Sequence, residues 1–206
     1  DTSPLAPAHC VIEPLDQTVS LVDASEEVAD EVRNFQKCLI RMLESKGQMA
    51  VFLEQHLAPS RLLEGALAGV GGGGKVAMAV ECVPLSVRDG QAVPAFFRKA
   101  ILEAGEEWSQ HRKLYESQGN IRGTVPPGFS YFACTFGVHA GYATVIEDEA
   151  NWSKDFGRDV LEGILEHPDA GIPLSRRRKE PFEKMQQRVS AMTAAFQPFD
   201  WTQHLA

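Results

Sequence analysis

The spacing of apolar residues at the start of the chain predicts a strand followed by a helix. Residues 10–15 are a short apolar run closed by a proline, which is typical of a strand. From residue 28 to residue 43 apolar side chains recur every three or four positions, the period of an amphipathic helix. Asp23, with Glu26 three positions later, is a helix-start signal, and Lys46 followed by a glycine is a stop signal.

Two further strands are predicted in the first half. One covers residues 49–53, and the other, residues 75–85, alternates between two faces. The alternation places Val76, Met78, Val80 and Cys82 on one face and Ala77, Ala79 and Glu81 on the other. Between the two strands, residues 57–74 break the pattern, and the glycine run at 71–74 is predicted to be mobile because it offers almost nothing to pack.

The second half predicts a helix, a hairpin and two closing helices. Residues 84–94 are predicted to connect two units, with Pro94 in the first turn of a helix. That helix carries an apolar stripe made of Phe97, Ile101, Ala104, Trp108 and Tyr115. Residues 129–136 and 142–146 are rich in aromatic and β-branched side chains on either side of a glycine turn, which predicts a β-hairpin.

Helices are then predicted over residues 154–166 and 181–196, and the aromatic tail at 198–201 is predicted to dock back on the fold. The predicted class is α+β, with antiparallel sheets flanked by helices. The predicted division is a first unit at residues 1–88 and a smaller second unit at residues 89–206.

Composition narrows the class of protein. The chain has 206 residues, 44% of them apolar, with short apolar runs, so no membrane-spanning segment and no membrane partner are expected. It lacks a signal-peptide pattern and begins at Asp1, from which we expect a piece of a longer protein. The cysteines stand far apart and are interpreted as buried thiols in a reducing compartment, cytosol or nucleus: Cys10, Cys38, Cys82 and Cys134.

Motifs for catalysis or cofactors are weak. Residues 69–75 have the spacing of a phosphate-binding loop, but Val76 stands where magnesium binding needs serine or threonine, and the loop runs into a strand rather than a helix. The six histidines are dispersed without metal-ligand spacing. No catalytic residue, cofactor or metal site is therefore predicted.

Charge leaves two interpretations open. A net charge of −8 argues against broad polyanion binding but not against a local basic patch. One basic run exists at residues 176–179. It is either a solvated loop before a helix or a contact for RNA or an acidic partner.

Several segments resemble the C-terminal region of the CwfJ-like splicing factors, in which two modules follow each other. In the first half the matching segments are Ala8–Pro14, Val32–Leu39 and Glu81–Leu85. In the second half they are Phe97–Ile101, Glu106–Trp108, Val125–Phe132, Gly141–Asp148, Phe156–Arg158 and Phe199–Thr202. The resemblance covers most of the chain outside the glycine-rich segment, in the expected order.

The resemblance implies that the first module is similar to the histidine-triad fold, whose N-terminal strands are expected upstream of Asp1. Active histidine-triad enzymes use alternating histidines on one strand, one of them as nucleophile on a nucleotide phosphate. By resemblance, Ala77 and Gln17 stand where histidines are expected, and His9 is retained. A methyl group cannot attack phosphorus, so the resemblance implies a protein that is not an enzyme.

The resemblance further implies a nuclear component of late spliceosomes that hold an excised intron lariat, linked to lariat turnover and to the lariat debranching enzyme. Its expected partners are spliceosomal proteins and intron lariat or small nuclear RNA. The candidate RNA contacts are basic residues: Arg98, Lys99, Arg122, Lys154, Arg158, Arg176, Arg177, Arg178 and Lys179. Two alternatives stay open: a pure protein-interaction scaffold, which the acidic charge favours, and a histidine-triad-type nucleotide hydrolase or transferase that uses an unrecognised residue.

Overall fold

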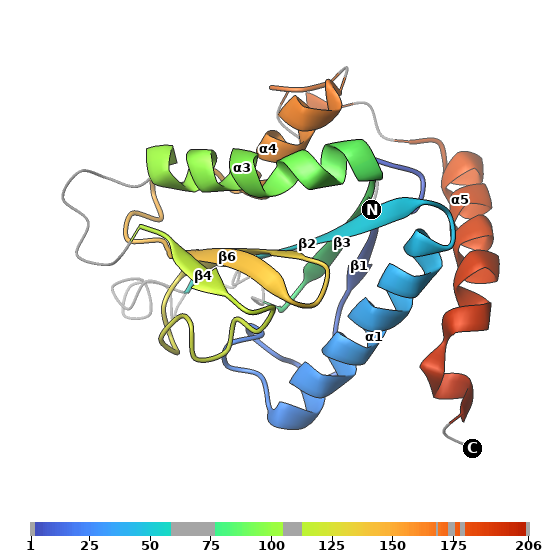
Figure 1. Ribbon diagram of the computed structural model, residues 1–206, viewed down its shortest axis with the longest axis horizontal. Coiled ribbons are helices and arrows are strands. Elements are labelled where there is room, and N and C mark those ends of the chain that lie inside the picture. Colours follow the sequence, from blue (N-terminus) through green and yellow to red (C-terminus); the bar gives the residue numbers. More distant parts are fainter. Residues whose placement is uncertain are drawn as a thin grey trace, which may run out of the picture.

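One antiparallel sheet forms the centre of the protein (Figure 1). The computed structural model describes residues 3–58, 77–104, 113–167, 169–172, 176–177 and 180–204. Within them the strand order is β1-β3-β2-β5-β6-β4, and every neighbouring pair is antiparallel. The strands are β1 (Cys10–Ile12), β2 (Gln48–His56), β3 (Val80–Ser86), β4 (Tyr115–Ser117), β5 (Tyr131–Phe136) and β6 (Ala140–Val145). The predicted α+β class with an antiparallel sheet flanked by helices is confirmed.

Helix α1 (Glu26–Glu44) covers one face of the sheet, as the apolar spacing predicts. Its apolar side packs on side chains of β2 and β3 in a cluster that includes Val32, Leu39, Met42, Leu43, Phe52, Val80 and Cys82. The capping residue is Ser25 rather than Asp23, because the Ser25 hydroxyl accepts the N–H of Val28 at 3.3 Å. Asp23 lies earlier and accepts a hydrogen bond from the Ser20 hydroxyl instead.

Helices α3 (Val87–Ala104) and α4 (Phe156–Leu165) cover the opposite face (Figure 1). The connector predicted at residues 84–94 is wrong, because β3 runs to Ser86 and α3 begins at the next residue. Pro94 therefore lies inside the helix rather than in its first turn. The predicted apolar stripe along α3 is confirmed for Phe97 and Ile101, which are buried. It is wrong for Tyr115, which belongs to β4.

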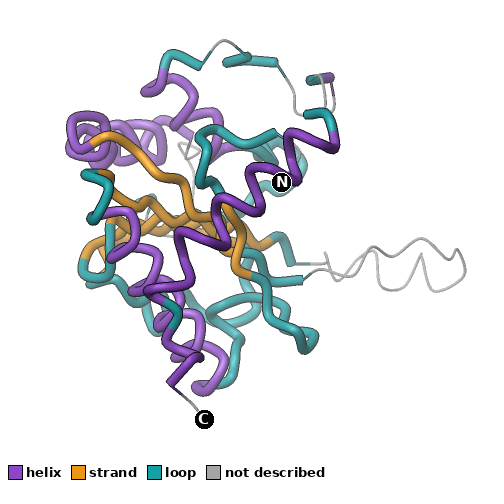
Figure 2. Tube along the Cα trace, turned by 90° about the vertical axis from the view of Figure 1, so that its right-hand side faces the viewer, coloured by secondary structure: helices purple, strands orange, loops and turns teal. Residues whose placement is uncertain are grey.

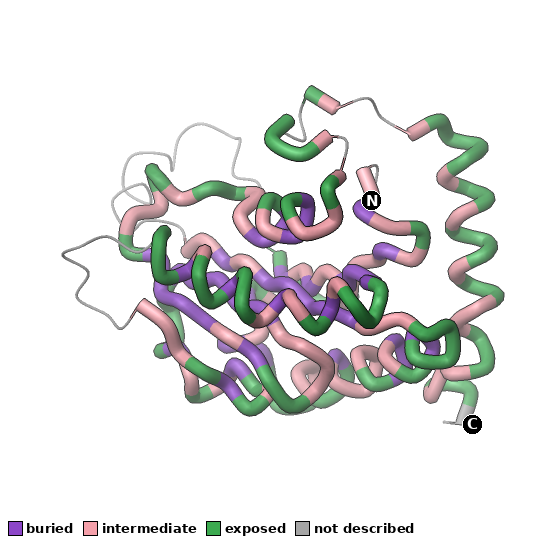
Figure 3. Tube along the Cα trace, turned by 45° about the horizontal axis from the view of Figure 1, so that its top comes forward, coloured by how far each residue is buried: buried purple, intermediate pink, exposed green. Residues whose placement is uncertain are grey.

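The C-terminal part returns to the first half of the chain, as predicted. Helix α5 (Phe182–Phe196) and the 3-10 helices η2 (Gln197–Phe199) and η3 (Trp201–His204) lie beside α1. The ring of Trp201 stands edge-on to Phe35, with centroids 5.9 Å apart. No residue of α5 is buried, so this helix is attached along one side and exposed on the other (Figures 1 and 3).

The sheet runs through both predicted units. Strand β2 pairs with β5 along its last six residues, which joins the first 88 residues to the later ones. The predicted hairpin is confirmed as β5 and β6, with Phe136 paired to Ala140. The predicted division at residue 88 stays a prediction. Within the described residues, no helix is long and apolar enough to cross a bilayer.

Some predictions fall outside the described residues. The glycine run at 71–74 and the loop at 69–75 belong to this group. Figure 2 shows the described helices, strands and loops in a second view, turned by 90°. Strand β2 extends three residues beyond its predicted end and finishes at His56, so Glu54 is a residue of the strand.

Candidate functional site

The face of β3 that looks toward α4 is where the resemblance to the histidine-triad fold puts its active strand. Ala77 is exposed and Ala79 is half-buried just before β3, and Glu81 follows within the strand. Ala79 and Glu81 line a cavity of about 250 Å³ together with residues of β2, β5 and α4. The remaining lining residues are Leu53, Gln55, Phe132, Lys154, Asp155, Gly157 and Arg158.

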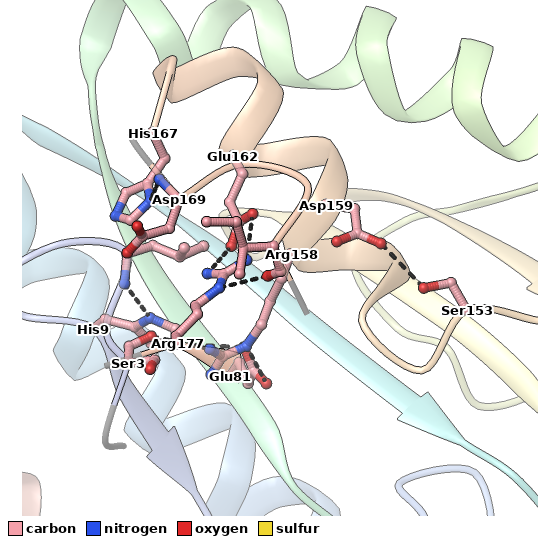
Figure 4. Close-up of polar contacts among 12 residues, drawn as sticks. Ser3, His9, Glu81, Ser153, Arg158, Asp159, Glu162, His167, Asp169 and Arg177 are labelled. Carbon is pink, nitrogen blue, oxygen red and sulfur yellow. Dashed lines mark hydrogen bonds and ion pairs between the residues drawn. The ribbon is translucent and has the colours of Figure 1, made fainter. Parts of the chain in front are cut away.

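Glu81 is held from two sides (Figure 4). The Nε of Arg158 donates to its Oε1 and Oε2, at 3.2 and 3.0 Å. The same guanidinium donates through Nη1 to the carbonyl of Ser3 at 3.1 Å. On the other side, Nε2 of His9 lies 3.3 Å from Oε2 of Glu81. Because Arg158 is a residue of α4, this network joins the helix to β3 and to the N-terminal segment that precedes β1.

His9 has no lone pair available for attack on phosphorus. It is only 2% exposed, and burial lowers its pKa despite the nearby Glu81, so the imidazole is neutral. Its Nδ1 accepts the backbone N–H of Leu5 at 3.1 Å. A neutral imidazole has one acceptor nitrogen, so the proton sits on Nε2 and points toward Glu81.

The carboxyl of Glu81 is ionised. Burial acts to raise its pKa, but the hydrogen bond from His9 and the positive charge of Arg158 outweigh it and lower the pKa. A carboxylate between two donors is stable in this setting because both of its oxygens are occupied. The arrangement holds the fold together and presents no activated nucleophile.

Arg177, in the basic run at 176–179, also points into the protein. Its guanidinium donates to both carboxylate oxygens of Glu162, with Nη2 and Oε2 2.8 Å apart, and its Nε donates to the carbonyl of Ile172 at 2.7 Å (Figure 4). The Glu162 side chain is fully buried, and the Arg177 side chain is 4% exposed. Arg176 next to it is exposed, whereas Arg178 and Lys179 lie outside the described residues.

The other basic candidates lie at separate places on the surface. Arg98 and Lys99 are exposed on α3, where they meet Glu116 and Glu103 at 3.5 and 3.7 Å. Lys154 is exposed and shares the cavity beside β3 with Arg158. Half-buried Arg122 belongs to a loop on the α1 side of the sheet. Their contact with RNA stays a prediction.

A second cavity, of about 130 Å³, lies on the α1 side of the sheet and was not predicted. Glu54 of β2 lines it and is 5% exposed. Its Oε1 accepts the N–H of Leu21 at 2.7 Å, and the Tyr131 hydroxyl lies within hydrogen-bonding reach of the same carboxyl. Burial raises the pKa of this carboxyl to about 7. The sequence signal was an acid directly after an apolar run, at the point where the predicted strand ended three residues too early.

Among the described residues, no group of three or more histidine, cysteine, aspartate or glutamate side chains is arranged to hold a metal ion.

Comparison with known proteins finds similarity over most of the chain. Residues 1–66 match the family described as "Protein similar to CwfJ C-terminal", and residues 107–202 match "Protein similar to CwfJ C-terminus 2". The chain is 33% identical over 200 residues to CWF19-like protein 2 of Homo sapiens, covering 96% of this chain and 21% of that protein. It is 31% identical over 211 residues to Pre-mRNA-splicing factor cwf19 of Schizosaccharomyces pombe, covering 98% and 30%. The chain thus spans less than a third of the length of either relative.

Proposed function

The chain belongs to the CwfJ-like family, as its C-terminal region, and on that premise we propose that it is a binding part of a nuclear pre-mRNA splicing factor. The fission-yeast relative is named a pre-mRNA-splicing factor. In this proposal the chain acts in late spliceosomes that hold an intron lariat. It binds spliceosomal proteins and lariat or small nuclear RNA, and connects to lariat turnover and the debranching enzyme.

The observation that carries the binding role is the state of the β3 face. The side chains there are two alanines and a glutamate, and the glutamate is paired with Arg158 and His9. Covalent transfer of a nucleotide needs a nucleophile with a free lone pair next to the phosphorus. The methyl groups of Ala77 and Ala79 supply none. The imidazole of His9 is neutral and its acceptor nitrogen is already bonded to the Leu5 N–H, which supports a protein that binds without catalysis.

RNA contact is proposed for the exposed cations only. Arg158 and Arg177 are engaged in internal ion pairs, so their removal would disturb the fold rather than a surface. Arg98 and Lys99 pair with the exposed acids Glu116 and Glu103, and exposed pairs of this kind contribute little, about 0–1 kcal/mol, so phosphate can displace them. Lys154 and Arg176 are the other exposed cations among the described candidates. Arg98, Lys99, Lys154 and Arg176 are therefore the proposed phosphate contacts.

A charge-reversal experiment tests this surface. The double variant Arg98→Glu, Lys99→Glu is compared with the wild type for binding of a branched, lariat-type RNA. Two phosphate contacts carry about 1 kcal/mol or more each, so binding should weaken at least about tenfold. The double variant Arg41→Glu, Lys46→Glu, which reverses two exposed cations at and just after the end of α1, is the matched control. Equal loss in the control would mean that net charge alone matters, and no loss in the double variant would remove α3 from the RNA surface.

A pure protein scaffold is the second candidate, and one observation favours it. The formal net charge is −8, and several large apolar side chains are exposed, among them Phe96 on α3 and Phe182 on α5. Apolar exposure on two helices suits a protein partner better than a phosphate backbone. Wild-type protein that binds neither branched nor linear RNA would favour this candidate.

A further inference from the structure

Two cysteines stand directly opposite each other on neighbouring strands of the sheet. The register of the antiparallel pair β1 and β3 places Cys10 against Cys82 (Figure 1). Both side chains lie on the α1 side of the sheet, where Cys82 belongs to the apolar cluster under that helix and Cys10 packs against it. The two thiols are close enough to share a hydrogen bond, and both are free rather than bonded to each other.

The backbone spacing at this pair suits a disulfide. Directly opposite residues of antiparallel strands have Cα atoms about 4.5–5.5 Å apart, which falls within the span of about 4.4–6.8 Å that disulfides bridge. The bond therefore needs rotation of the two side chains and no slip of one strand along the other. Cys134 differs, because its partners across β5 are Leu53 and Tyr142.

The two thiols differ in exposure and in acidity. Cys10 is half-buried, whereas Cys82 has no exposed surface. The hydrogen bond with the Cys82 thiol lowers the pKa of Cys10, although burial acts in the opposite direction. The same hydrogen bond, together with burial, raises the pKa of Cys82. Because the thiolate is the reactive form of cysteine, Cys10 is the sulfur that reacts first and Cys82 is the resolving thiol.

We propose that Cys10 and Cys82 form a reversible disulfide when the protein meets hydrogen peroxide, and that this bond joins β1 covalently to β3. In the first step the Cys10 thiolate attacks one peroxide oxygen. The O–O bond breaks, a sulfenic acid forms on Cys10, and the other oxygen takes up a proton and leaves as water. In the second step the Cys82 sulfur attacks the Cys10 sulfur, the S–O bond breaks, and the hydroxyl leaves as water with the proton of Cys82. The two thiols lose two electrons, which reduce the peroxide to two waters.

The bond would act where several elements meet. Strand β1 has three residues and stands at one end of the described sheet, so few ladder hydrogen bonds hold it. His9, just before β1, lies against Glu81, and its carbonyl accepts Nη1 of Arg188 of α5 at 3.4 Å. Short strands at an edge open locally at low free-energy cost, and a covalent bond to β3 prevents this opening. It also encloses α1 and β2 in a closed loop, which restricts the unfolded chain.

The test is a thiol count on the whole chain before and after hydrogen peroxide, by alkylation of the unfolded protein and mass spectrometry. Two of the four thiols should disappear, and the peptides that contain Cys10 and Cys82 should stay linked until a reductant separates them. The oxidised protein should also unfold at a higher urea concentration than the reduced protein. Four intact thiols, or a bond to Cys38 or Cys134, would overturn the proposal.

Variants assign the role of each sulfur. Cys82→Ala should stop the reaction at the Cys10 sulfenic acid, which dimedone traps. Cys10→Ser should leave the buried Cys82 thiol unreacted and abolish the shift of the urea midpoint. Cys134→Ala removes a buried thiol that has no cysteine opposite, and it should still form the bond, which makes it the matched control.

The half-buried site of Cys10 keeps the proposal testable if Cys82→Ala fails to fold. Circular dichroism checks the folding of each variant. A peroxide-induced midpoint shift in Cys10→Ser as large as that of the wild type would overturn the proposal. The pair is separate from the cations proposed for RNA contact, so the two proposals stand or fall independently.

Discussion

Arg158 of α4 donates through Nε to both carboxylate oxygens of Glu81 on β3, at 3.2 and 3.0 Å. The two residues are 77 positions apart, one on each side of the predicted division of the chain. Nε2 of His9 also lies 3.3 Å from Oε2 of Glu81, so α4, β3 and the residue just before β1 meet at one carboxylate. The polar groups on this face of the sheet thus hold elements together, which is the basis for proposing a binding rather than a catalytic role.

The first prediction concerns nucleotide chemistry. On the proposed binding role, the wild-type chain should not hydrolyse an adenosine phosphoramidate above the uncatalysed rate, because Ala77, Ala79 and Glu81, the described residues of the β3 face, offer no activated nucleophile. The measurement is release of AMP and ammonia at high protein concentration. Hydrolysis that disappears in His9→Gln, with folding intact by circular dichroism, would contradict the proposal.

The buried pair of Arg177 and Glu162 gives a prediction for stability. Arg177→Ala leaves the fully buried Glu162 carboxylate without its partner, and breaking such a pair costs about 3–5 kcal/mol of unfolding free energy. Denaturant unfolding measures the loss. Arg176→Ala changes an exposed neighbour and should stay within about 0.5 kcal/mol of the wild type. Similar small effects in both variants would show that Arg177 does not hold α4.

Two glycines of α4 give a matched pair of variants. A Cβ at Gly157 would lie 2.8 Å from the Phe132 ring and 3.0 Å from Leu53, so Gly157→Ala should destabilise by about 1–3 kcal/mol. A Cβ at Gly163 meets nothing within 4 Å, and Gly163→Ala should stabilise the helix by about 0.5–1 kcal/mol. Thermal unfolding of both variants is the measurement. Stabilisation by both would mean that α4 does not pack tightly on the sheet.

The buried carboxyl of Glu54 leads to a prediction for the pH dependence of folding stability. Its pKa is about 7 in the folded chain against an ordinary 4.5, so the folded state holds its proton to higher pH. The contribution of this carboxyl to the free energy of unfolding is therefore fully present below about pH 4.5. It is lost as the pH rises through 7, and the total loss is about 3 kcal/mol.

Replacing the carboxyl isolates this contribution. Glu54→Gln should gain stability relative to the wild type across this pH window and keep the gain above it. The comparison is made as a difference because burial lowers the pKa of His9 and His56, which acts in the opposite direction below about pH 6.5. A constant difference between the two proteins from pH 4.5 to 8 would refute the buried, protonatable state of Glu54.

Periodicity predicted the fold well wherever a face is uniformly apolar. Helix α1, the β5–β6 hairpin and the docked tail at Trp201 follow directly from spacing and aromatic content. The predicted start of α3 at Pro94 was wrong. Proline is common in the first turn of helices, whereas Pro94 lies in the interior of α3.

The polar interior was much harder to predict. Arg158 stands three and seven positions before Leu161 and Leu165, which places it on the inner face of α4, and this spacing could have marked it as internal. No local signal pairs Glu162 with Arg177, because the pair forms across a loop that returns to the helix. The sequence alone does not distinguish an exposed charged residue from one that is paired inside the fold, because the pairing depends on tertiary contacts.

The most direct test of the proposed role is the salt dependence of RNA binding by the wild-type chain. Affinity for a branched lariat-type RNA and for its linear counterpart would be measured at several salt concentrations. Four phosphate contacts predict a slope of about −3 to −4 in log affinity against log salt, with tighter binding of the branched RNA. Binding that does not weaken with salt, or no binding to either RNA, would contradict direct RNA recognition and leave the chain as a protein scaffold.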